Sequence, residues 1–398
     1  MRTYADTLQA AAEAYPPQPI GVRVFRAALN RFLLLPLGVL IALAWANIEP
    51  ESYFRTSHAV AFPVNEIGMA IFLALVAQEL YEALMPGGAL AAWRHRALPA
   101  FAAIGGFAGS VVSYFWLISV WHEQVLAPAW PMVAAIDLAA GYYMLRLIYP
   151  RRGSVVAFLL LTAVLTDSMA IAIVSAQASL AIHPAGFALL AAALASAAIL
   201  RINRVKSFWP YWMISGTLSW FALRWMGIHP ALALVPIVPL LPHDRRTDDV
   251  FADRLDDTAV HHAEHEWNMA AQVVLFLFGL VNGGVILKHA DTGTWSVLLA
   301  ALIGRPAGMM AAIALGVAAG FRLPARIQWR DVAVMVMATS CGFTFALFLG
   351  ETVLPIGAVA EQVTLGALLT IAGALLTLAG AWLAGVGRFA RAGGRHGL

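Results

Sequence analysis

The chain contains few charged residues, one cysteine and no sequence signature of an enzyme. Charged residues make up 12% of its 398 residues, about half the fraction found in soluble domains. The single cysteine, Cys341, excludes an intrachain disulfide and a cysteine-based metal site. The sequence has no nucleotide-binding loop, nucleophile elbow or metal-binding triad. We therefore expect no enzyme activity, no cofactor, no nucleic-acid partner and no use of ATP.

Hydrophobic residues instead fill long segments that could cross a membrane. They make up 61% of the chain, in runs of about twenty residues, which is enough to span a bilayer as a helix. Residues 1–19 contain no such run, so we expect no cleavable signal peptide. The pattern predicts an all-α polytopic membrane protein with twelve transmembrane helices, at 28–48, 63–85, 98–120, 127–148, 154–176, 184–200, 207–225, 229–242, 268–288, 294–320, 331–350 and 358–387.

The distribution of positive charge predicts the orientation of these spans. If the N-terminus is cytoplasmic, all 25 Arg and Lys residues lie on the inner side, except Arg55, Arg224 and Lys288 on the outer side and Arg305 within a span. Cytoplasmic loops of membrane proteins carry such an excess of Arg and Lys. We therefore expect both termini to be cytoplasmic.

The stretch 159–176, LLLTAVLTDSMAIAIVSA, carries a single carboxylate, Asp167. Counted from Val155, Asp167 lies about 18 Å along a helix, near the middle of a hydrocarbon core roughly 30 Å thick. A lone acid at that depth costs at least ~2.5 kcal/mol, which marks it as functional by default. Arg305 lies at similar depth in the tenth span and could neutralise Asp167 as a purely structural pair.

Two other spans combine polar residues with helix-breaking ones. Asp137 lies in the fourth span between Pro131 and Gly141, so a broken helix is plausible there. Asp137 could also simply cap a half-helix, where a carboxylate is favourable. In the eleventh span the residues 339–344, TSCGFT, form a second candidate break.

The second span carries three further acids, and a histidine opens the eighth. Glu66 starts the second span on its outer side, while Glu79 and Glu82 lie near its inner end. The simplest interpretation of Glu66 and Glu82 is that they lie at the membrane surface. For Glu79 the sequence favours neither this interpretation nor a functional role. For His229, at the start of the eighth span, the sequence likewise does not distinguish a surface residue from a functional one.

The largest polar segment is 243–266, which holds eight acids and four histidines. Its simplest interpretation is a solvated cytoplasmic linker. Because clustered histidines titrate near neutrality, it could instead sense pH, with Glu264 and His265 as candidates. A metal site is a third, weaker interpretation, since the His-His-x-x-His spacing is not specific.

The spans also suggest an internal repeat. The third to fifth and the tenth to twelfth spans form two sets of three that enter the membrane from opposite faces, each with an interrupted middle helix. Interrupted helices at corresponding positions of inverted repeats indicate a midplane ion site in a secondary transporter.

Several motifs resemble the NhaA-type sodium/proton antiporters over nearly the whole chain after Phe32. They are NEIGMAIFLALVAQEL, FAAIGGF, AAIDLA, VLTDSMAI, MGIHPALA, VNGGV, ALIGRPAGM and CGFTFALF. The resemblance implies twelve helices, with the fourth and eleventh unwound and crossing at the ion site. It also implies proton-driven exchange by alternating access, a role in pH homeostasis, and a homodimer in the inner membrane of a bacterium.

Position by position, the resemblance assigns roles to the polar residues. Asp167 matches the cation ligand and proton carrier, and Asp137 matches the acid of the unwound fourth helix, which compensates half-helix dipoles. Glu79 matches a funnel glutamate, Glu66 an outer acid, and His229 a histidine linked to pH response. The unwound regions correspond to Ile136 in the fourth helix and to Gly342, Phe343 and Thr344 in the eleventh.

Two positions depart from the family pattern. Thr166 replaces the first of the family's paired aspartates, and Arg305 replaces its tenth-helix lysine. Thr166 offers a neutral oxygen ligand, and Arg305 stays charged where a buried lysine could lose its proton. Asp167 is then the only obvious titrating group, so we expect one proton to exchange for one Na⁺ or Li⁺. The alternatives are an anion or organic solute held at Arg305, or a sensor that transports nothing.

The expected organisation follows from the same resemblance. A cytoplasmic lead (1–27) and tail (388–398) would flank a transmembrane domain (28–387). Its core would comprise 98–176 and 294–387, and its interface part 28–85 and 184–288. The outer segment 49–63 could form a hairpin at a dimer contact.

Overall fold

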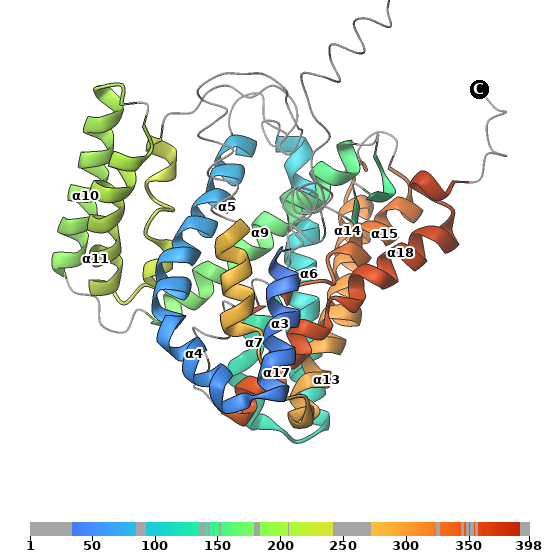
Figure 1. Ribbon diagram of the computed structural model, residues 1–398. Coiled ribbons are helices and arrows are strands. Elements are labelled where there is room, and N and C mark those ends of the chain that lie inside the picture. The colour runs from blue at the N-terminus through green and yellow to red at the C-terminus, as the bar shows by residue number, and fades with distance from the viewer. Residues whose placement is uncertain are drawn as a thin grey trace, which may run out of the picture.

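A computed structural model of the chain describes residues 34–84, 93–134, 153–178, 184–205, 207–241, 272–323, 327–343 and 357–390, with isolated residues between 141 and 150 and between 346 and 354. Within these ranges all regular structure is helical and no strand occurs. Figure 1 shows the helices gathered into one bundle, with α10 and α11 at one edge and α14, α15 and α18 at the opposite edge.

Most of the described α-helices are strongly apolar, whereas α4 (Pro50–Phe62) carries several polar and charged residues. In chain order the described α-helices are α3 (Leu34–Ile48), α4 (Pro50–Phe62), α5 (Met69–Leu84), α6 (Trp93–Val120), α7 (Trp130–Ala134), α9 (Gly153–Ala178), α10 (Pro184–Ile202), α11 (Thr217–Trp225), Gln272–Asn282, α13 (Thr292–Leu299), α14 (Arg305–Ala318), α15 (Trp329–Ala338), α17 (Ala358–Leu369) and α18 (Ala372–Ala384).

Shorter pieces of wider or tighter helix join or precede several of these. The π-helical turns are η1 (Pro63–Gly68), η3 (Tyr211–Gly216) and η7 (Ala300–Gly304). The 3₁₀ turns are η2 (Gln124–Ala129), η4 (Pro230–Leu232), η5 (Val238–Leu240), η6 (Leu287–His289) and η8 (Gly387–Phe389).

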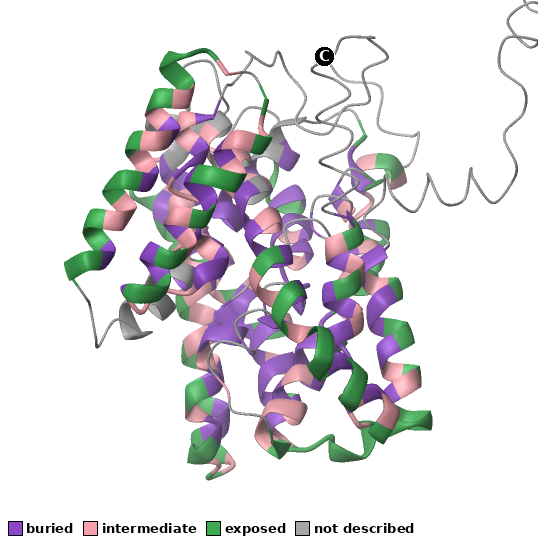
Figure 2. Ribbon diagram, turned by 60° about the vertical axis from the view of Figure 1, so that its left-hand side comes forward, coloured by how far each residue is buried: buried purple, intermediate pink, exposed green. Residues whose placement is uncertain are grey.

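Five described helices are long and apolar enough to cross a membrane. They are Pro50–Ala74, Ala97–Val120, Pro184–Ile202, Thr292–Ala318 and Ala358–Phe389. Figure 2 shows buried residues in the interior of the bundle and exposed ones along its flanks. Many of the exposed side chains are large and apolar, such as Leu40, Ile202, Leu315 and Trp382. An apolar exterior of this kind suits lipid rather than water.

The outer segment 49–63 is a helix and not a hairpin. Pro50 stands in the first turn of α4, where its missing N–H costs nothing. The helix continues through η1 into α5, so the chain is helical from Pro50 to Leu84. Tyr53 of α4 is buried, and its hydroxyl donates to the carbonyl of Val281 (2.7 Å). This anchors α4 to the bundle and disfavours an independent hairpin.

The expected eighth span, 229–242, contains no α-helix within its described residues. His229 is followed by η4, a run of turns and η5. Most of its hydrogen bonds join residues three apart, as in Leu232 N–H to His229 O (3.1 Å) and Leu240 N–H to Ile237 O (2.9 Å). Pro230, Pro236 and Pro239 supply no N–H, so a regular α-helical ladder cannot form.

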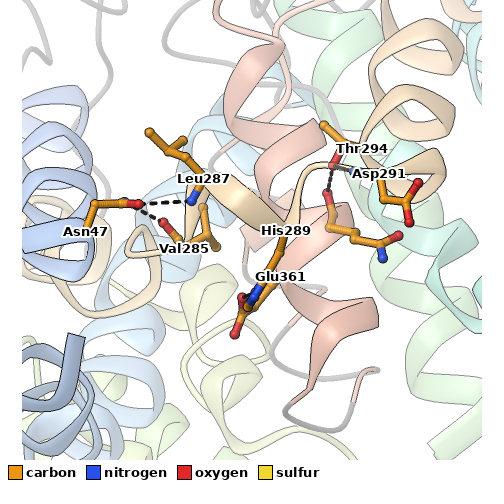
Figure 3. Close-up of polar contacts among 8 residues, drawn as sticks. Asn47, Val285, Leu287, His289, Asp291, Thr294 and Glu361 are labelled. Carbon is orange, nitrogen blue, oxygen red and sulfur yellow. Dashed lines mark hydrogen bonds and ion pairs between the residues drawn. The ribbon is translucent and has the colours of Figure 1, made fainter.

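The connection that leads into α13 is held at both ends (Figure 3). Asn47, near the end of α3, donates to the carbonyl of Val285 (2.9 Å) and accepts from the N–H of Leu287 (3.0 Å). Two residues further on, His289 pairs with Glu361 in the first turn of α17. These contacts join α3, this connection and α17 at one end of the bundle.

Helices α6 and α14 cross through matched pairs of glycines. Gly105 and Gly109 on α6 have the same four-residue spacing as Gly304, the N-cap of α14, and Gly308 within α14. A Cβ atom at Gly308 would lie 2.6 Å from the Cα of Gly109, and one at Gly109 would lie 2.7 Å from the Cα of Gly308. Small residues spaced in this way let helix backbones approach closely within membranes. The contact fixes the beginning of α14, which is where Arg305 stands.

We predict that Gly308→Ala destabilises the protein, by about 1–3 kcal/mol, because the added methyl group forces two backbones apart. Gly380→Ala in α18 is the matched control, since a Cβ there meets no backbone atom, only the end of the flexible Met337 side chain (Sδ at 3.1 Å and Cε at 3.5 Å). Thermal melting of the purified protein in detergent measures both variants. Equal melting temperatures for the two would show that the glycine crossing is not tight.

Candidate functional site

Asp167 and Thr166 lie on α9, buried in the centre of the bundle. Asp167 is 1% exposed and Thr166 is fully buried. Helix α9 packs against α5, α6, α7 and α15. Its own buried side chains, such as Leu159 and Val164, lie in one apolar cluster with Ala102 of α6 and Met335 of α15. The sequence places Asp167 near the middle of a membrane span, and the structure shows that its side chain is buried within the bundle.

The Thr166 hydroxyl donates its one hydrogen to a carbonyl of its own helix. Its Oγ1 donates to the carbonyl of Thr162 at 2.8 Å. Thr162 is also buried, and its own hydroxyl donates to the carbonyl of Phe158 at 2.9 Å. A hydroxyl has two acceptor lone pairs besides its hydrogen. The Thr166 oxygen therefore keeps acceptor capacity next to the Asp167 carboxylate.

Arg305 is the largest fully buried side chain among the described residues, at 1% exposure. One terminal nitrogen donates to the carbonyl of Thr339 (2.7 Å) and the other donates to the carbonyl of Val133. Arg305 lies against α6 at Gly106, where a Cβ would be in ordinary contact with the Arg305 Cγ (3.5 Å) and too close to the Met309 Cε (2.6 Å). The planar guanidinium binds two carbonyls at once, one with each terminal nitrogen. A lysine ammonium group has no such pair of fixed, separated donors.

The two carbonyls bound by Arg305 belong to two different helical segments. Thr339 is the C-cap of α15, and Val133 lies in α7, whose described residues end at Ala134. Carbonyls at a helix C-terminus carry partial negative charge and lack intrahelical partners. At the C-cap of α15 the Arg305 guanidinium therefore supplies a donor for the Thr339 carbonyl and offsets that charge.

Arg305 also interacts electrostatically with Asp167 and, to a smaller extent, with Cys341. The side chain therefore connects the carboxylate on α9 with the turn that follows α15. Burying either charge alone would be very costly, so each compensates the other. The chemical result is a water-poor site with one carboxylate, one hydroxyl oxygen and one fixed positive charge.

Helical hydrogen bonding is interrupted after α15. The helix ends at Ala338, a turn follows at Thr339 and Ser340, and the N–H of Ala346 then donates to the carbonyl of Gly342 (3.2 Å). Phe343 is buried at 3% exposure, and Gly342 is also buried. The stretch that sequence reasoning selected as a possible break therefore lies beside Arg305.

Glu66 and His229 lie elsewhere, in the region where η1, η4 and α11 meet. Glu66 of η1 is half-buried, and its charge interacts with that of Arg224, whose guanidinium stands 5.7 Å from the Trp220 ring centre. His229 caps η4, accepting at Nδ1 from the N–H of Ala231 (3.2 Å). No described contact joins this group to Asp167.

Several predicted site residues fall outside the described part of the chain. They are Ile136, Asp137, Thr344, Glu264 and His265, and the side chains of Glu79 and Glu82 are outside it as well. Their roles stay predictions.

Sequence reasoning named Asp167 as a possible partner of Arg305, but it did not identify the two main-chain carbonyls that the guanidinium binds. Main-chain carbonyls carry no sequence signal, so the contact to Val133 could not be predicted. Thr162, which orients Thr166, lies one helical turn before it, and this spacing is the one signal that could have pointed to it.

Comparison with known proteins identifies the family. The profile of the Na⁺/H⁺ antiporter 1 family matches residues 23–383. The chain is 36% identical to a protein named Na(+)/H(+) antiporter NhaA from Geobacter metallireducens, over 86% of this chain and 93% of the relative. It is also 36% identical to the protein of the same name from Geotalea uraniireducens, over 87% and 94%. The chain therefore belongs to the Na⁺/H⁺ antiporter family, whose members are membrane transporters and not enzymes.

Proposed function

We propose that this chain exchanges Na⁺ or Li⁺ for protons, one for one, by alternating access through Asp167. The observation that carries the proposal is the buried Asp167 carboxylate beside the permanent charge of Arg305. One carboxylate can hold either a proton or a cation, and the two forms of the site have the same net charge. Competition for one group thus couples the two ions.

The ligands for a small cation would be oxygen atoms of this site. Deprotonated Asp167 supplies the charge, and the Thr166 hydroxyl supplies a neutral oxygen whose lone pairs are available. Hard cations such as Na⁺ prefer oxygen ligands of these types. Main-chain carbonyls at the interruption after α15 would complete the coordination, together with the fourth helix around Ile136 and Asp137.

Arg305 in this account is a fixed counter-charge and not a proton carrier. Both of its terminal nitrogens already donate to carbonyls, so a solute carboxylate would have to displace these bonds. This disfavours the alternative of an anion or organic solute held at Arg305. It also leaves Asp167 as the group that changes protonation in each cycle.

The remaining features of the proposal follow the family. They are twelve spans with inverted repeats, unwound fourth and eleventh helices including Thr344, and a homodimer in a bacterial inner membrane with both termini cytoplasmic. The matched glycine pairs on α6 and α14 support the repeats, since these helices correspond in the two halves. Glu79, Glu66, His229, Glu264 and His265 are proposed to tune the response to pH.

Cation-induced proton movement in proteoliposomes tests the function. Purified protein is reconstituted with a pH dye inside, and Na⁺, Li⁺ or K⁺ is added outside. We expect Na⁺ or Li⁺ to make the lumen more alkaline as cations enter and protons leave. If folded protein gives no pH change with any of the three cations, the proposed function is wrong.

A further inference from the structure

Thr370 is a buried polar residue that touches the interrupted segment after α15. It is 2% exposed, and its hydroxyl oxygen accepts a hydrogen bond from the N–H of Gly342 at 3.2 Å. The same hydroxyl donates to the carbonyl of Ala367 at 2.5 Å. Because the hydroxyl hydrogen is donated to Ala367 of the same helix, the oxygen acts as an acceptor for the N–H of Gly342.

Gly342 lies where helical hydrogen bonding resumes after the interruption that follows α15. The carbonyl of Gly342 accepts the first bond of the new turn, from the N–H of Ala346. The first N–H groups of a helix have no partner within it and must be satisfied from outside. The Thr370 hydroxyl supplies an acceptor here, in a region closed to water.

The helix that carries Thr370 is itself interrupted at this residue. Helix α17 ends at Leu369, and α18 begins at Ala372. Between them the N–H of Gly373 donates to the carbonyl of Thr370 (2.8 Å), a bond between residues three apart. A Cβ at Gly373 would lie 3.1 Å from the Cβ of Ser340 and 3.2 Å from the N of Cys341. The two interruptions therefore pack directly against each other.

We infer that Thr370 is a positioning residue for the cation site, acting through the main chain of Gly342. Its hydroxyl fixes the backbone between the Thr339 carbonyl, which Arg305 binds, and the point where the helix resumes. The directions of the carbonyls in this stretch, and hence their fit to a cation, depend on that bond. This inference rests on the proposed function, because it assigns Thr370 to the same site.

The test compares three variants in the proteoliposome assay. Thr370→Val removes the hydroxyl and keeps the shape, whereas Thr370→Ser keeps the hydroxyl. Thr377→Val is the matched control, because Thr377 is equally buried on α18 and its hydroxyl bond, to Gly373 O at 2.6 Å, stays within its own helix. The readout is the Na⁺ concentration for half-maximal proton movement, measured apart from the maximal rate.

Thr370→Val should raise the half-maximal Na⁺ concentration about tenfold, the effect of losing one typical buried hydrogen bond. Thr370→Ser and Thr377→Val should stay within about twofold of the wild type, since the bond to Gly342 is kept. Hydrogen exchange of a peptide containing Gly342 should become faster in Thr370→Val alone. That measurement follows the bond itself and does not depend on transport.

Two results would overturn the inference and leave the proposed function intact. In one, the wild type exchanges cations for protons, but Thr370→Val has the same half-maximal concentration as Thr377→Val. In the other, Thr370→Val lowers the melting temperature and the maximal rate without changing that concentration, which is the effect of a merely structural residue. A wild type that moves no protons would instead contradict the proposed function, and the inference with it.

Discussion

Replacing Asp167 by asparagine should reduce cation-driven proton movement to the level of liposomes without protein. Asparagine has nearly the same shape as aspartate, but it can neither bind and release a proton nor offer a negative charge to a cation. The Thr166 hydroxyl offers no charge to a cation, and both terminal nitrogens of Arg305 already donate to carbonyls, so neither neighbour replaces the carboxylate. The measurement is the change in lumenal pH after addition of Na⁺ or Li⁺.

Asp331→Asn is the control for this variant. Asp331 is also buried, at 2% exposure, but it caps the start of α15, where its carboxylate accepts from the N–H of Gln328 (2.9 Å). Asparagine retains a carbonyl oxygen for that bond, so transport should persist. Proton movement that survives in Asp167→Asn, with a cation dependence like that of the wild type, would remove Asp167 from the mechanism.

Replacing Arg305 by methionine should give the largest loss of stability, about 3–5 kcal/mol, because it leaves the buried charge of Asp167 without compensation. It also leaves the carbonyls of Thr339 and Val133 without their donors, each at a further cost. Thermal melting in detergent measures the loss. The expected result is a melting temperature well below those of the wild type and of Gly380→Ala.

The double variant Arg305→Met with Asp167→Asn separates charge from hydrogen bonding. Removing both charges should recover part of the lost stability, because no uncompensated ion then stays buried. The part that is not recovered measures the hydrogen bonds to the two carbonyls. A single Arg305→Met variant that melts like the wild type would show that the guanidinium is not needed for either purpose.

Much of the candidate site could be predicted because polar groups are rare inside membrane spans. Asp167 and Arg305 stand out in apolar sequence, and both are buried in the structure. The stretch from Thr339 to Phe343 could be selected because it interrupts an apolar run with polar and small residues. In each case the residue could be selected because a polar group in lipid is energetically costly and is therefore rare unless it has a function.

Contacts between segments could not be predicted in the same way. The glycine pairs of α6 and α14 are visible in the sequence, but their partners are not, because spacing along one helix does not identify the other. The contact between Thr370 and Gly342 could not be predicted for a related reason. Threonine is common in membrane helices, and only the fold places its hydroxyl beside the N–H of Gly342.

The measurement that tests the central claim most directly is the membrane potential during exchange. Proteoliposomes containing wild-type protein receive a Na⁺ gradient in the presence of a voltage-sensitive dye, and the rate of proton movement is compared with and without valinomycin and K⁺. If Asp167 exchanges one proton for one cation, no potential develops and valinomycin leaves the rate unchanged. A potential that grows during exchange, with faster proton movement when valinomycin dissipates it, would show that a second charge moves in each cycle and would contradict the account.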